Sequence, residues 1–452
     1  MRSTEVTGER AQVRFPSDGD GLPVIGGPPV ADADLPLPAD LRGDPPFPVD
    51  VHDLPAVDAD VPGAVGRVLA RVLAGRVGRA RATDAVFARD IAERVARFTL
   101  DGGKRTRSCF VWWGLRACGG ADAASAEAAL RIGAALELVQ TCALVQDDVM
   151  DGARLRRGRP ALHTDIAAQY APVAPGAGGE RFGEAAAILA GDLALAWAED
   201  LVADTVLALA PDAARRVHGV WSAMRTEMVA GQYLDVQGGA TSAHRGGTPP
   251  AHRTARALRA ACLKSALYSV ERPLALGAAL AGADGATTRA LTTAGRYAGL
   301  AFQLRDDLQD VFADPRRTGK PSGGDIRSGK PTYLVALARA RAEASGDRRA
   351  LAVLRRSLGR ADLSGAQLAR VREVLVGTGA RDVVEARIER LAAQALRHLS
   401  TAVLDPVAEP HLRRLLCAAA GVPAGRGGTR AEPGPGRAGP APLTVPAPGA
   451  GR

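Results

Sequence analysis

Two aspartate triplets carry the clearest chemical meaning in this sequence of 452 residues. Each has acids at positions i, i+1 and i+4, and the triplets are Asp147, Asp148 and Asp151, and Asp306, Asp307 and Asp310. On a helix the first and last acids of a triplet share one face, and the middle acid is rotated by about 100°. Carboxylates this close repel one another unless a cation lies among them, and Mg²⁺ takes oxygen ligands. The triplets therefore predict a magnesium site if their helices face each other.

A solvated acidic helix end would also explain the first triplet. The helix dipole makes the carboxyl end of a helix unfavourable for acids, however, and the second triplet repeats the pattern. Mg²⁺ usually keeps several waters and is held by a few carboxylates together with substrate phosphates. Two facing triplets therefore indicate a phosphorylated ligand that bridges the metal ions.

Lysine is rare in this chain, and each lysine stands near glycine, an acid or a small hydroxyl residue. The 58 lysines and arginines include only four lysines, which are Lys104, Lys264, Lys320 and Lys330. A lysine kept where arginine supplies most of the positive charge indicates a site that needs a compact ammonium group. Chance survival of a rare residue is the alternative. The two lysines that follow the second triplet favour phosphate binding.

The segment GGKRTR, residues 102–107, is a further candidate for binding an anion. Two glycines precede a predicted helix start at residue 104, so Lys104 and Arg107 would lie one turn apart beside free backbone N–H groups. The segment is not a P-loop, because it lacks the spacing GxxxxGK[ST].

The elements that must position these residues are helices. Ala, Leu and Arg are good helix formers, aromatic residues make up only 4% of the chain, and clear period-two alternation is absent from the sequence. We predict an all-α fold with one helical bundle around a central cavity at residues 59–420, and disordered extensions at 1–58 and 421–452. The predicted helices cover residues 62–76, 84–99, 104–117, 122–152, 183–209, 212–238, 250–282, 286–313, 331–344, 364–378, 380–402 and 408–419. Longer loops are expected around 171–181 and 239–249.

Charge and cysteine content narrow the function classes. The net charge is +9, but the arginines are spread among acids and form no dense tract, so we expect no nucleic-acid partner. The five cysteines show no CxxC spacing, which is typical of buried thiols in a reducing cytoplasm. No uninterrupted apolar run is long enough to cross a bilayer, so we expect at most peripheral membrane contact.

Taken together, the motifs resemble those of the trans-isoprenyl diphosphate synthases, the polyprenyl synthetase family, with actinobacterial geranylgeranyl diphosphate synthases as the nearest type. Over roughly residues 62–420 the chain contains, in the family's order, GGKRTR, ELVQ…QDDVMD…RRGRP, AGD, GQYLD, KSA and FQLRDDLQD…GKPSGGD…GK. The resemblance implies a Mg²⁺-dependent homodimer, with three ions per active site, that joins isopentenyl diphosphate to an allylic diphosphate.

The resemblance also implies a role for each site residue. Both aspartate triplets would hold Mg²⁺, and with Lys264 the first triplet, Asp306 and Asp307 would be catalytic. The allylic diphosphate would lie on Arg156, Lys264, Gln303, Lys320 and Lys330, with Ser265 in place of the family's usual threonine. The isopentenyl diphosphate would lie on Lys104, Arg107, Gln140 and Arg157. Gln140 and Gln146 stand where many members have histidine, so this site lacks a possible positive charge.

The reaction that the resemblance implies needs no protein nucleophile. Mg²⁺ would help the allylic diphosphate to leave, a dry apolar pocket would shield the carbocation, and isopentenyl diphosphate would attack it. Ala143 lies one turn before Asp147, and Cys142 precedes it. Because both are small, we expect a product longer than farnesyl diphosphate, namely geranylgeranyl diphosphate, with a pocket floor at Val139, Leu136 or a neighbouring helix.

Four alternatives stay open at this stage. A farnesyl or a longer-chain polyprenyl diphosphate synthase would carry the same motifs. A class I terpene cyclase shares the implied fold and the first acidic motif, but normally lacks a second DDxxD and the GGKRxR segment. A non-enzymatic Arg-rich binding module would explain the charge but not the paired triplets.

Overall fold

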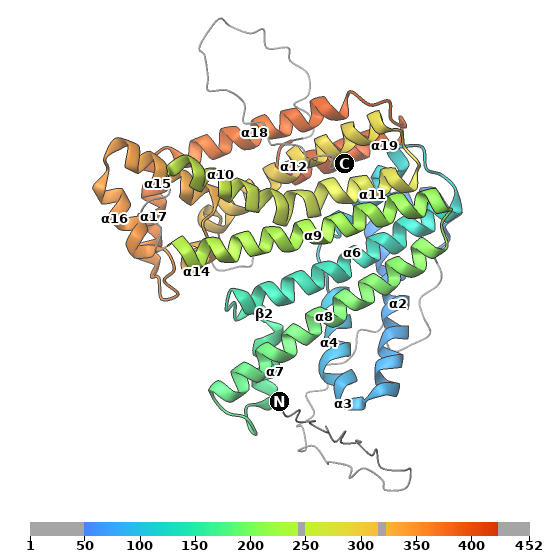
Figure 1. The fold of residues 1–452 in the computed structure, drawn as a ribbon, viewed down its shortest axis with the longest axis horizontal. Coiled ribbons are helices and arrows are strands. Elements are labelled where there is room, and N and C mark those ends of the chain that lie inside the picture. The colour runs from blue at the N-terminus through green and yellow to red at the C-terminus, as the bar shows by residue number, and fades with distance from the viewer. Residues whose placement is uncertain (1–48, 243–248, 315–321, 424–452) are drawn as a thin grey trace, which may run out of the picture.

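The computed structural model describes residues 49–242, 249–314 and 322–423, and these are almost entirely helical (Figure 1). The predicted all-α fold is therefore confirmed. Lys320, most of the two predicted extensions and part of the predicted loop at 239–249 lie outside the described residues.

The helices follow one another with short connections, and after the first triplet they are interrupted by a β-hairpin of two strands with two residues each. In chain order the elements are α1 (Leu54–Ala59), α2 (Val61–Thr83), α3 (Ala85–Phe87), the π-helix η2 (Ala88–Ala92), α4 (Glu93–Leu100), α5 (Thr106–Ala117), α6 (Ala123–Met150), β1 (Leu155–Arg156), β2 (Arg159–Pro160), α7 (Leu162–Tyr170), α8 (Ala177–Leu207), α9 (Pro211–Ser242), α10 (Pro250–Ala261), the π-helix η3 (Cys262–Glu271), α11 (Arg272–Leu280), α12 (Gly285–Phe312), α14 (Gly324–Ser328), α15 (Tyr333–Ser345), α16 (Arg348–Ser357), α17 (Gly365–Gly377), α18 (Ala380–Leu399) and α19 (Ala408–Ala420).

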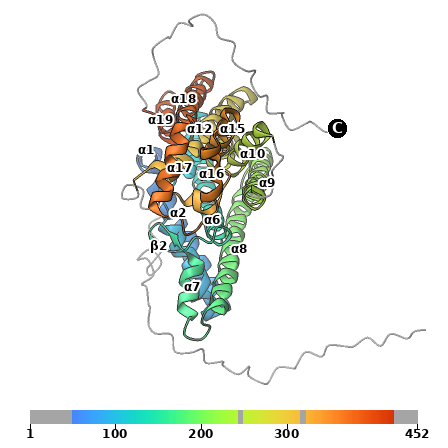
Figure 2. The same cartoon turned by 90° about the vertical axis from the view of Figure 1, so that its left-hand side faces the viewer.

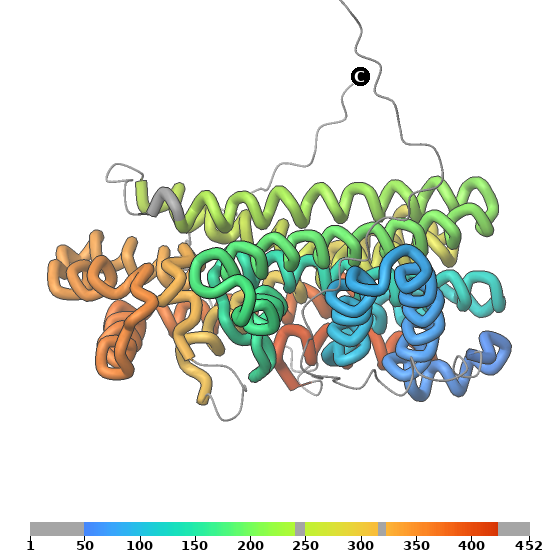
Figure 3. Tube along the Cα trace, turned by 90° about the horizontal axis from the view of Figure 1, so that it is seen from below, coloured from blue at the N-terminus to red at the C-terminus, as the bar shows by residue number. Residues whose placement is uncertain are grey.

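Two hydrophobic clusters hold the bundle together. The larger joins α2, α5, α6, α8 and α11, and the smaller joins α12 to α15, α17 and α18. Figure 3 shows α15–α17 at the end of the molecule opposite α1 and α2. In Figures 1 and 2, α7 and the start of α8 project toward the end where α3 lies.

Helix α6 is the central element that carries the first triplet. It begins at the N-cap Asp122, whose carboxylate accepts the backbone N–H of Ser125, and the chain leaves it at Gly152, where φ is +62°. Among the described residues, α6 is the helix that is long and apolar enough to cross a membrane. Because most of its apolar stretch is buried against α5 and α8, α6 is the core helix of this bundle.

The predicted helix at 250–282 is found as one continuous helical run over residues 250–280, but its middle part, η3, is a π-helix that the sequence did not predict. Pro273 lacks an N–H group and cannot donate to the carbonyl of Ser269, which favours the wider π geometry just before it. Two glycines allow the close approach of neighbouring helices to η3. A Cβ on Gly231 of α9 would lie 2.2 Å from the backbone N of Lys264, and one on Gly299 of α12 would lie 2.5 Å from the carbonyl of Ala266.

The ordered fold begins earlier than the predicted boundary at residue 59. Helix α1 lies inside the predicted extension, and Asp58 accepts hydrogen bonds from the Trp112 Nε1 (2.7 Å) and from Arg116. At the other end, Val422 still packs against the smaller cluster, beyond the predicted boundary at 420. Helices α7, α14 and α16 and the β1–β2 hairpin were not predicted.

Candidate active site

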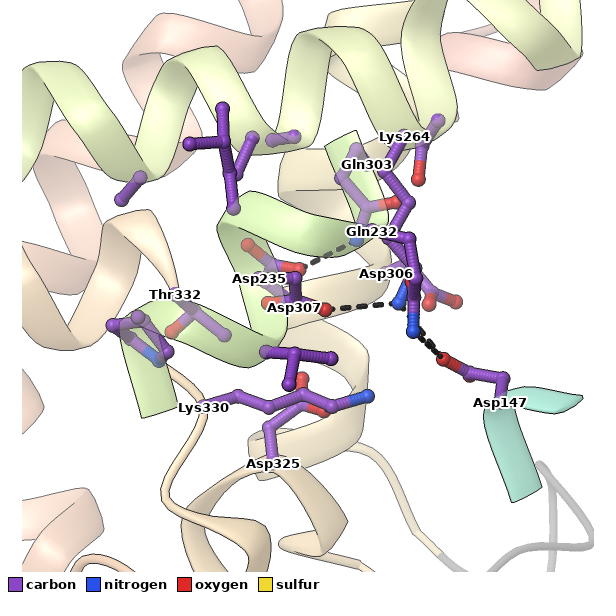
Figure 4. Close-up of a pocket in the computed structure, with 18 of the residues that line it drawn as sticks. Asp147, Gln232, Asp235, Lys264, Gln303, Asp306, Asp307, Asp325, Lys330 and Thr332 are labelled. Atoms are coloured by element: carbon purple, nitrogen blue, oxygen red, sulfur yellow. Dashed lines mark hydrogen bonds and ion pairs between the residues drawn. The ribbon is translucent and has the colours of Figure 1, made fainter. Parts of the chain in front are cut away.

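A cavity of about 700 Å³ lies between α6, α9, η3 and α12 (Figure 4). Its wall contains most of the residues that the sequence singles out. These are Arg107, Gln140, Asp147, Arg156, Lys264, Ser265, Gln303, Asp306, Asp307 and Lys330. The predicted meeting of the two triplets is thus found, because Asp147 comes from α6 and Asp306 and Asp307 come from α12 on the other side.

Within the first triplet, the outer two acids face lysines and the middle one faces an arginine. Asp147 Oδ1 lies 3.0 Å from the Lys264 Nζ, and Asp151 Oδ2 lies 2.6 Å from the Lys330 Nζ. Asp148 is buried with 1% of its side chain exposed, and both of its oxygens accept hydrogen bonds from Arg156. The structure thus places Asp148 outside the cavity wall, in contact with Arg156 of the hairpin, and its role in holding a metal ion stays a prediction.

The second triplet is completed by an acid from another element. Asp306 is exposed to the cavity, and Asp307 is buried and accepts a hydrogen bond from the Gln303 Nε2 at 2.7 Å. Asp310 is not in the cavity wall, because its Oδ2 accepts the backbone N–H of Asp325 at 3.0 Å. This contact fixes α14 against α12 and places the Asp325 carboxylate beside the cavity.

Burial and mutual repulsion control the charge of these acids. Burial raises the pKa of Asp307 well above its ordinary value, and the nearby Asp325 adds to the effect. Burial and then Asp310 raise the pKa of Asp325 to about 7. The pKa of Asp147 is affected by burial, which would raise it, but the ammonium groups of Lys264 and Lys330 outweigh burial and lower it. The two ammonium groups therefore decide the direction of the shift at Asp147, whereas burial and neighbouring acids decide it at Asp307 and Asp325, although the Lys330 Nζ also lies 4.0 Å from Asp325 Oδ1.

The donor set fits magnesium. Five carboxylates line the cavity beside the ammonium groups of Lys264 and Lys330, and these acids are Asp147, Asp235, Asp306, Asp307 and Asp325. Asp151 is not in the wall, but it contacts Lys330. All are hard oxygen donors with excess negative charge, as Mg²⁺ requires. Among the described residues, no three His, Cys, Asp or Glu side chains are already arranged to hold an ion by themselves. Substrate phosphates and water would therefore complete the coordination.

The residues predicted for isopentenyl diphosphate are only partly assembled. Arg107 reaches the cavity, where its Nη2 donates to the Ser269 Oγ at 2.9 Å and its guanidinium lies 4.5 Å above the Tyr268 ring. Gln140 also lines the cavity, and its Oε1 is buried without a hydrogen-bond partner among the described residues. Arg157 lies outside the cavity wall, with its Nη1 3.0 Å from the carbonyl of Asp101.

The predicted helix start at residue 104 is wrong, and Lys104 is exposed outside the cavity wall. Helix α5 begins two residues later, because Arg105 adopts a left-handed conformation with φ at 47°. The Arg105 side chain donates to the carbonyl of Pro62 at 2.7 Å, which holds this break in place. Lys104 therefore belongs to the loop before α5, and Arg107 belongs to the helix.

Sequence reasoning left three residues of the site without a role. Asp235 lies 2.9 Å from the Lys264 Nζ, and the Gln232 Nε2 donates to Asp147 Oδ1 at 2.9 Å. Gln232 and Asp235 both belong to the GQYLD segment of α9. They are three positions apart, so they lie on the same face of this helix. Asp325 is the third, and an acid within the glycine-rich segment GKPSGGD was the available signal.

The fold and the site define a class: an all-helical isoprenoid synthase with an acidic cavity for a diphosphate. The family model for polyprenyl synthetase matches residues 89–367. The chain belongs to the polyprenyl synthetase family, and it is a trans-prenyl diphosphate synthase.

Known relatives agree on the family and differ in their products. The chain is 33% identical to the farnesyl diphosphate synthase of Geobacillus stearothermophilus, over 61% of this chain and 84% of the relative. It is 30% identical to the geranylfarnesyl diphosphate synthase of Aeropyrum pernix, over 63% and 79% of the two chains. A crystal structure of the geranylgeranyl pyrophosphate synthase of Corynebacterium glutamicum, complexed with isoprenyl diphosphate and magnesium, is 35% identical. It matches with a TM-score of 0.71 and covers 79% of this chain and 98% of that chain.

Proposed function

We propose that this enzyme condenses isopentenyl diphosphate with an allylic diphosphate to make geranylgeranyl diphosphate, with release of inorganic diphosphate. The observation that carries the product assignment is the position of Ala143. It lines the cavity one turn before Asp147 on α6, next to Cys142, which also lines it. Two small side chains at this point leave room for a growing prenyl chain beneath the diphosphate.

The chain's own residues divide the work of this reaction. Bound Mg²⁺, which we propose as three ions, would supply the Lewis acid that neutralises the allylic diphosphate as it leaves. Asp147 on α6, Asp151 at the C-cap of α6, and Asp306 and Asp307 on α12 would hold the ions. Asp310, which is in contact with α14, would position Asp325 for the same purpose.

Cationic and amide side chains would hold the allylic diphosphate. Lys264 and Lys330 are within reach of it, because they already contact the outer acids of the first triplet. Ser265 and Gln303 line the same part of the cavity. Arg156 would act by fixing Asp148 and the end of α6.

Isopentenyl diphosphate would lie at the end of the cavity formed by Arg107 and Gln140. Arg107 and Gln140 both line this space, and the side-chain N–H₂ group of Gln140 would donate to a phosphate oxygen. Lys104 and Arg157 would have to approach from the segments at 102–105 and 156–159, which lie beside each other, since Arg157 Nη2 is 3.9 Å from a Cβ built on Gly103.

Of the positions predicted for the pocket floor, which are Val139, Leu136 or a neighbouring helix, we propose the neighbouring helix. Leu136 and Val139 are fully buried but do not line the cavity. Tyr268 of η3 does line it, and its hydroxyl donates to the carbonyl of Leu136 at 3.3 Å. We assign the limit of chain growth to this tyrosine.

We further propose a homodimer in a reducing cytoplasm. Helix α8 exposes Ile188 and Leu189, with 46% and 62% of their surfaces accessible, and a second copy of the chain would cover such a face. All five cysteines are free thiols, as a reducing compartment favours. Light scattering coupled to gel filtration tests the dimer, and fractionation of cells tests the compartment. A monomer at micromolar concentration, or recovery outside the cytoplasm, would contradict these proposals.

The product assignment is tested by incubating the enzyme with isopentenyl diphosphate, each allylic primer in turn and Mg²⁺, followed by chain-length analysis. We expect geranylgeranyl diphosphate as the main product, and Ala143→Phe should shorten it because the ring fills the space below Asp147. Ala143→Ser is the matched control and should leave the product unchanged. Products of farnesyl length from the unmodified enzyme, or an unchanged product from Ala143→Phe, would refute this placement of the pocket.

A further inference from the structure

Residues of α10 and α15 line a further part of the same cavity, and we call this part the branch. One face of the continuous run from α10 into η3 lines it, through Arg256, Ala257, Ala260, Ala261 and Lys264. Lys264 lies eight positions after Arg256, which corresponds to about 12 Å along the helix axis. The small alanines between them leave a corridor with an ammonium group at one end and a guanidinium group at the other.

The charge of Arg256 is not balanced by a neighbouring acid. Its Nη2 donates to the Gln237 Oε1 at 3.2 Å, and Gln237 is neutral. Across the part of the chain that the structure describes, Arg256 forms no ion pair with a carboxylate. A half-buried guanidinium whose partner is an amide retains its attraction for an anion.

The opposite wall of the branch keeps Arg256 close to the segment that carries Lys330. A methyl group built on Gly238 would lie 3.7 Å from the Arg256 Nη2 and 2.6 Å from the Pro331 Cγ. The Arg256 guanidinium therefore lies near the residue that follows Lys330. Arg339 of α15 also lines the branch, and its Nε lies 3.1 Å from Glu343.

We propose that Arg256, with Arg339 across from it, forms a second anion subsite that receives inorganic diphosphate after it leaves Lys264 and Lys330. This inference rests on the proposed reaction, in which diphosphate is a product that must depart from a cavity. A polyanion in the corridor would pass from the ammonium groups to guanidinium groups, which bind phosphate oxygens through two N–H donors at once. Unlike the acidic part of the cavity, the branch needs no metal ion to attract phosphate.

Calorimetric titration of the full chain with inorganic diphosphate in the presence of EDTA tests the subsite. Without metal ions the carboxylates of the cavity cannot bind diphosphate, so the affinity for diphosphate that remains comes from the basic residues. We expect measurable binding that Arg256→Gln weakens by about tenfold, the usual size of a lost charged hydrogen bond. Arg259→Gln on the same helix is the matched control, because Arg259 is exposed and does not line the cavity. It should bind like the unmodified enzyme.

Two results would overturn the subsite: no binding in EDTA, or equal binding by Arg256→Gln and Arg259→Gln. If Arg256→Gln does not fold, as judged by its thermal unfolding, Arg256→Lys replaces it and should bind with intermediate affinity. A parallel titration with a prenyl diphosphate shows whether the subsite prefers inorganic diphosphate or the diphosphate group of a prenyl compound. Binding of the prenyl compound alone would overturn the assignment to inorganic diphosphate. These measurements require no turnover, so a wrong product assignment would appear in the chain-length assay and leave the binding result intact.

Discussion

Asp325 offers the sharpest test of the electrostatics of this site. Its pKa is raised to about 7, first by burial and then by Asp310. An acid whose pKa is raised in the folded state stabilises the protein below its unfolded-state pKa, and this stability is lost as the pH rises through the folded-state pKa. In the metal-free enzyme, Asp325 should therefore make the folded state less stable as the pH rises from about 4 to about 7.

The magnitude follows from the linkage between proton binding and folding. Between about pH 5 and pH 7, Asp325 is protonated in the folded state and ionised in the unfolded state. Each pH unit then lowers the free energy of unfolding by about 1.4 kcal/mol. Over this window the loss is about 3 kcal/mol, and it should be complete at about pH 8. The variant Asp325→Asn, which keeps the side-chain shape and cannot ionise, should not show this loss.

The assay is urea unfolding in EDTA at about pH 5 and about pH 8. We expect Asp325→Asn to gain about 3 kcal/mol relative to the unmodified enzyme between these conditions. Asp382→Asn is the control, since Asp382 is exposed on α18 far along the chain from the site, and it should show no such gain. With Mg²⁺ and inorganic diphosphate present, the difference in the free energy of unfolding between Asp325→Asn and the unmodified enzyme should reverse its sign. The reason is that the ionised carboxylate then faces cations. Equal pH dependence of the unmodified enzyme and Asp325→Asn in EDTA would refute the assigned environment of Asp325.

Three further predictions concern the groups around the cavity. Gly231→Ala should displace Lys264, so the KM for the allylic substrate should rise about tenfold while the KM for isopentenyl diphosphate stays unchanged. Gly219→Ala is the control and should behave like the unmodified enzyme, because its added methyl group meets no neighbouring atom within 4 Å. Equal KM values for the two variants would contradict this positioning role. Tyr268→Ala should lengthen the main product in the chain-length assay, and a product of the original length would place the floor elsewhere. Lys264→Arg should need more Mg²⁺ for thermal stabilisation in the presence of inorganic diphosphate, because a guanidinium holds Asp147 more tightly. The Mg²⁺ concentration that gives half of the maximal rise in melting temperature should increase at least about threefold. An unchanged concentration would show that lysine is not required for this reason.

The sequence was sufficient to predict the fold class and the meeting of the two triplets. Helical periodicity depends on local spacing, so the face that carries Asp147 and the rotation of Asp148 could be calculated without coordinates. The pairing of α6 with α12 across the cavity was not calculable from spacing. It was inferred because two identical acid patterns have a physical use only when they face each other.

The missed features depend on contacts between segments far apart in the chain. Helices α9 and α12 approach η3 closely at Gly231 and Gly299, and both glycines lie outside the predicted helix at 250–282. The late start of α5 results from the hydrogen bond of Arg105 to Pro62, which is 43 positions away in the sequence. Asp325 lies in the cavity wall because its backbone N–H donates to the Asp310 carboxylate, and no pattern of side chains in the sequence reveals this contact.

The choice between lysine and arginine now has a structural explanation in the first triplet. Arg156 holds both oxygens of Asp148, and this carboxylate is turned away from the cavity. Lys264 contacts Asp147 and Asp235, which line the cavity, and Lys330 contacts Asp151. A guanidinium bound through two N–H groups fixes its partner, whereas an ammonium group on a flexible stem can exchange one oxygen for another. On the proposed function, arginine occurs where an aspartate must stay in place, and lysine occurs where an aspartate would be released to a metal ion while the same ammonium group would turn to the diphosphate.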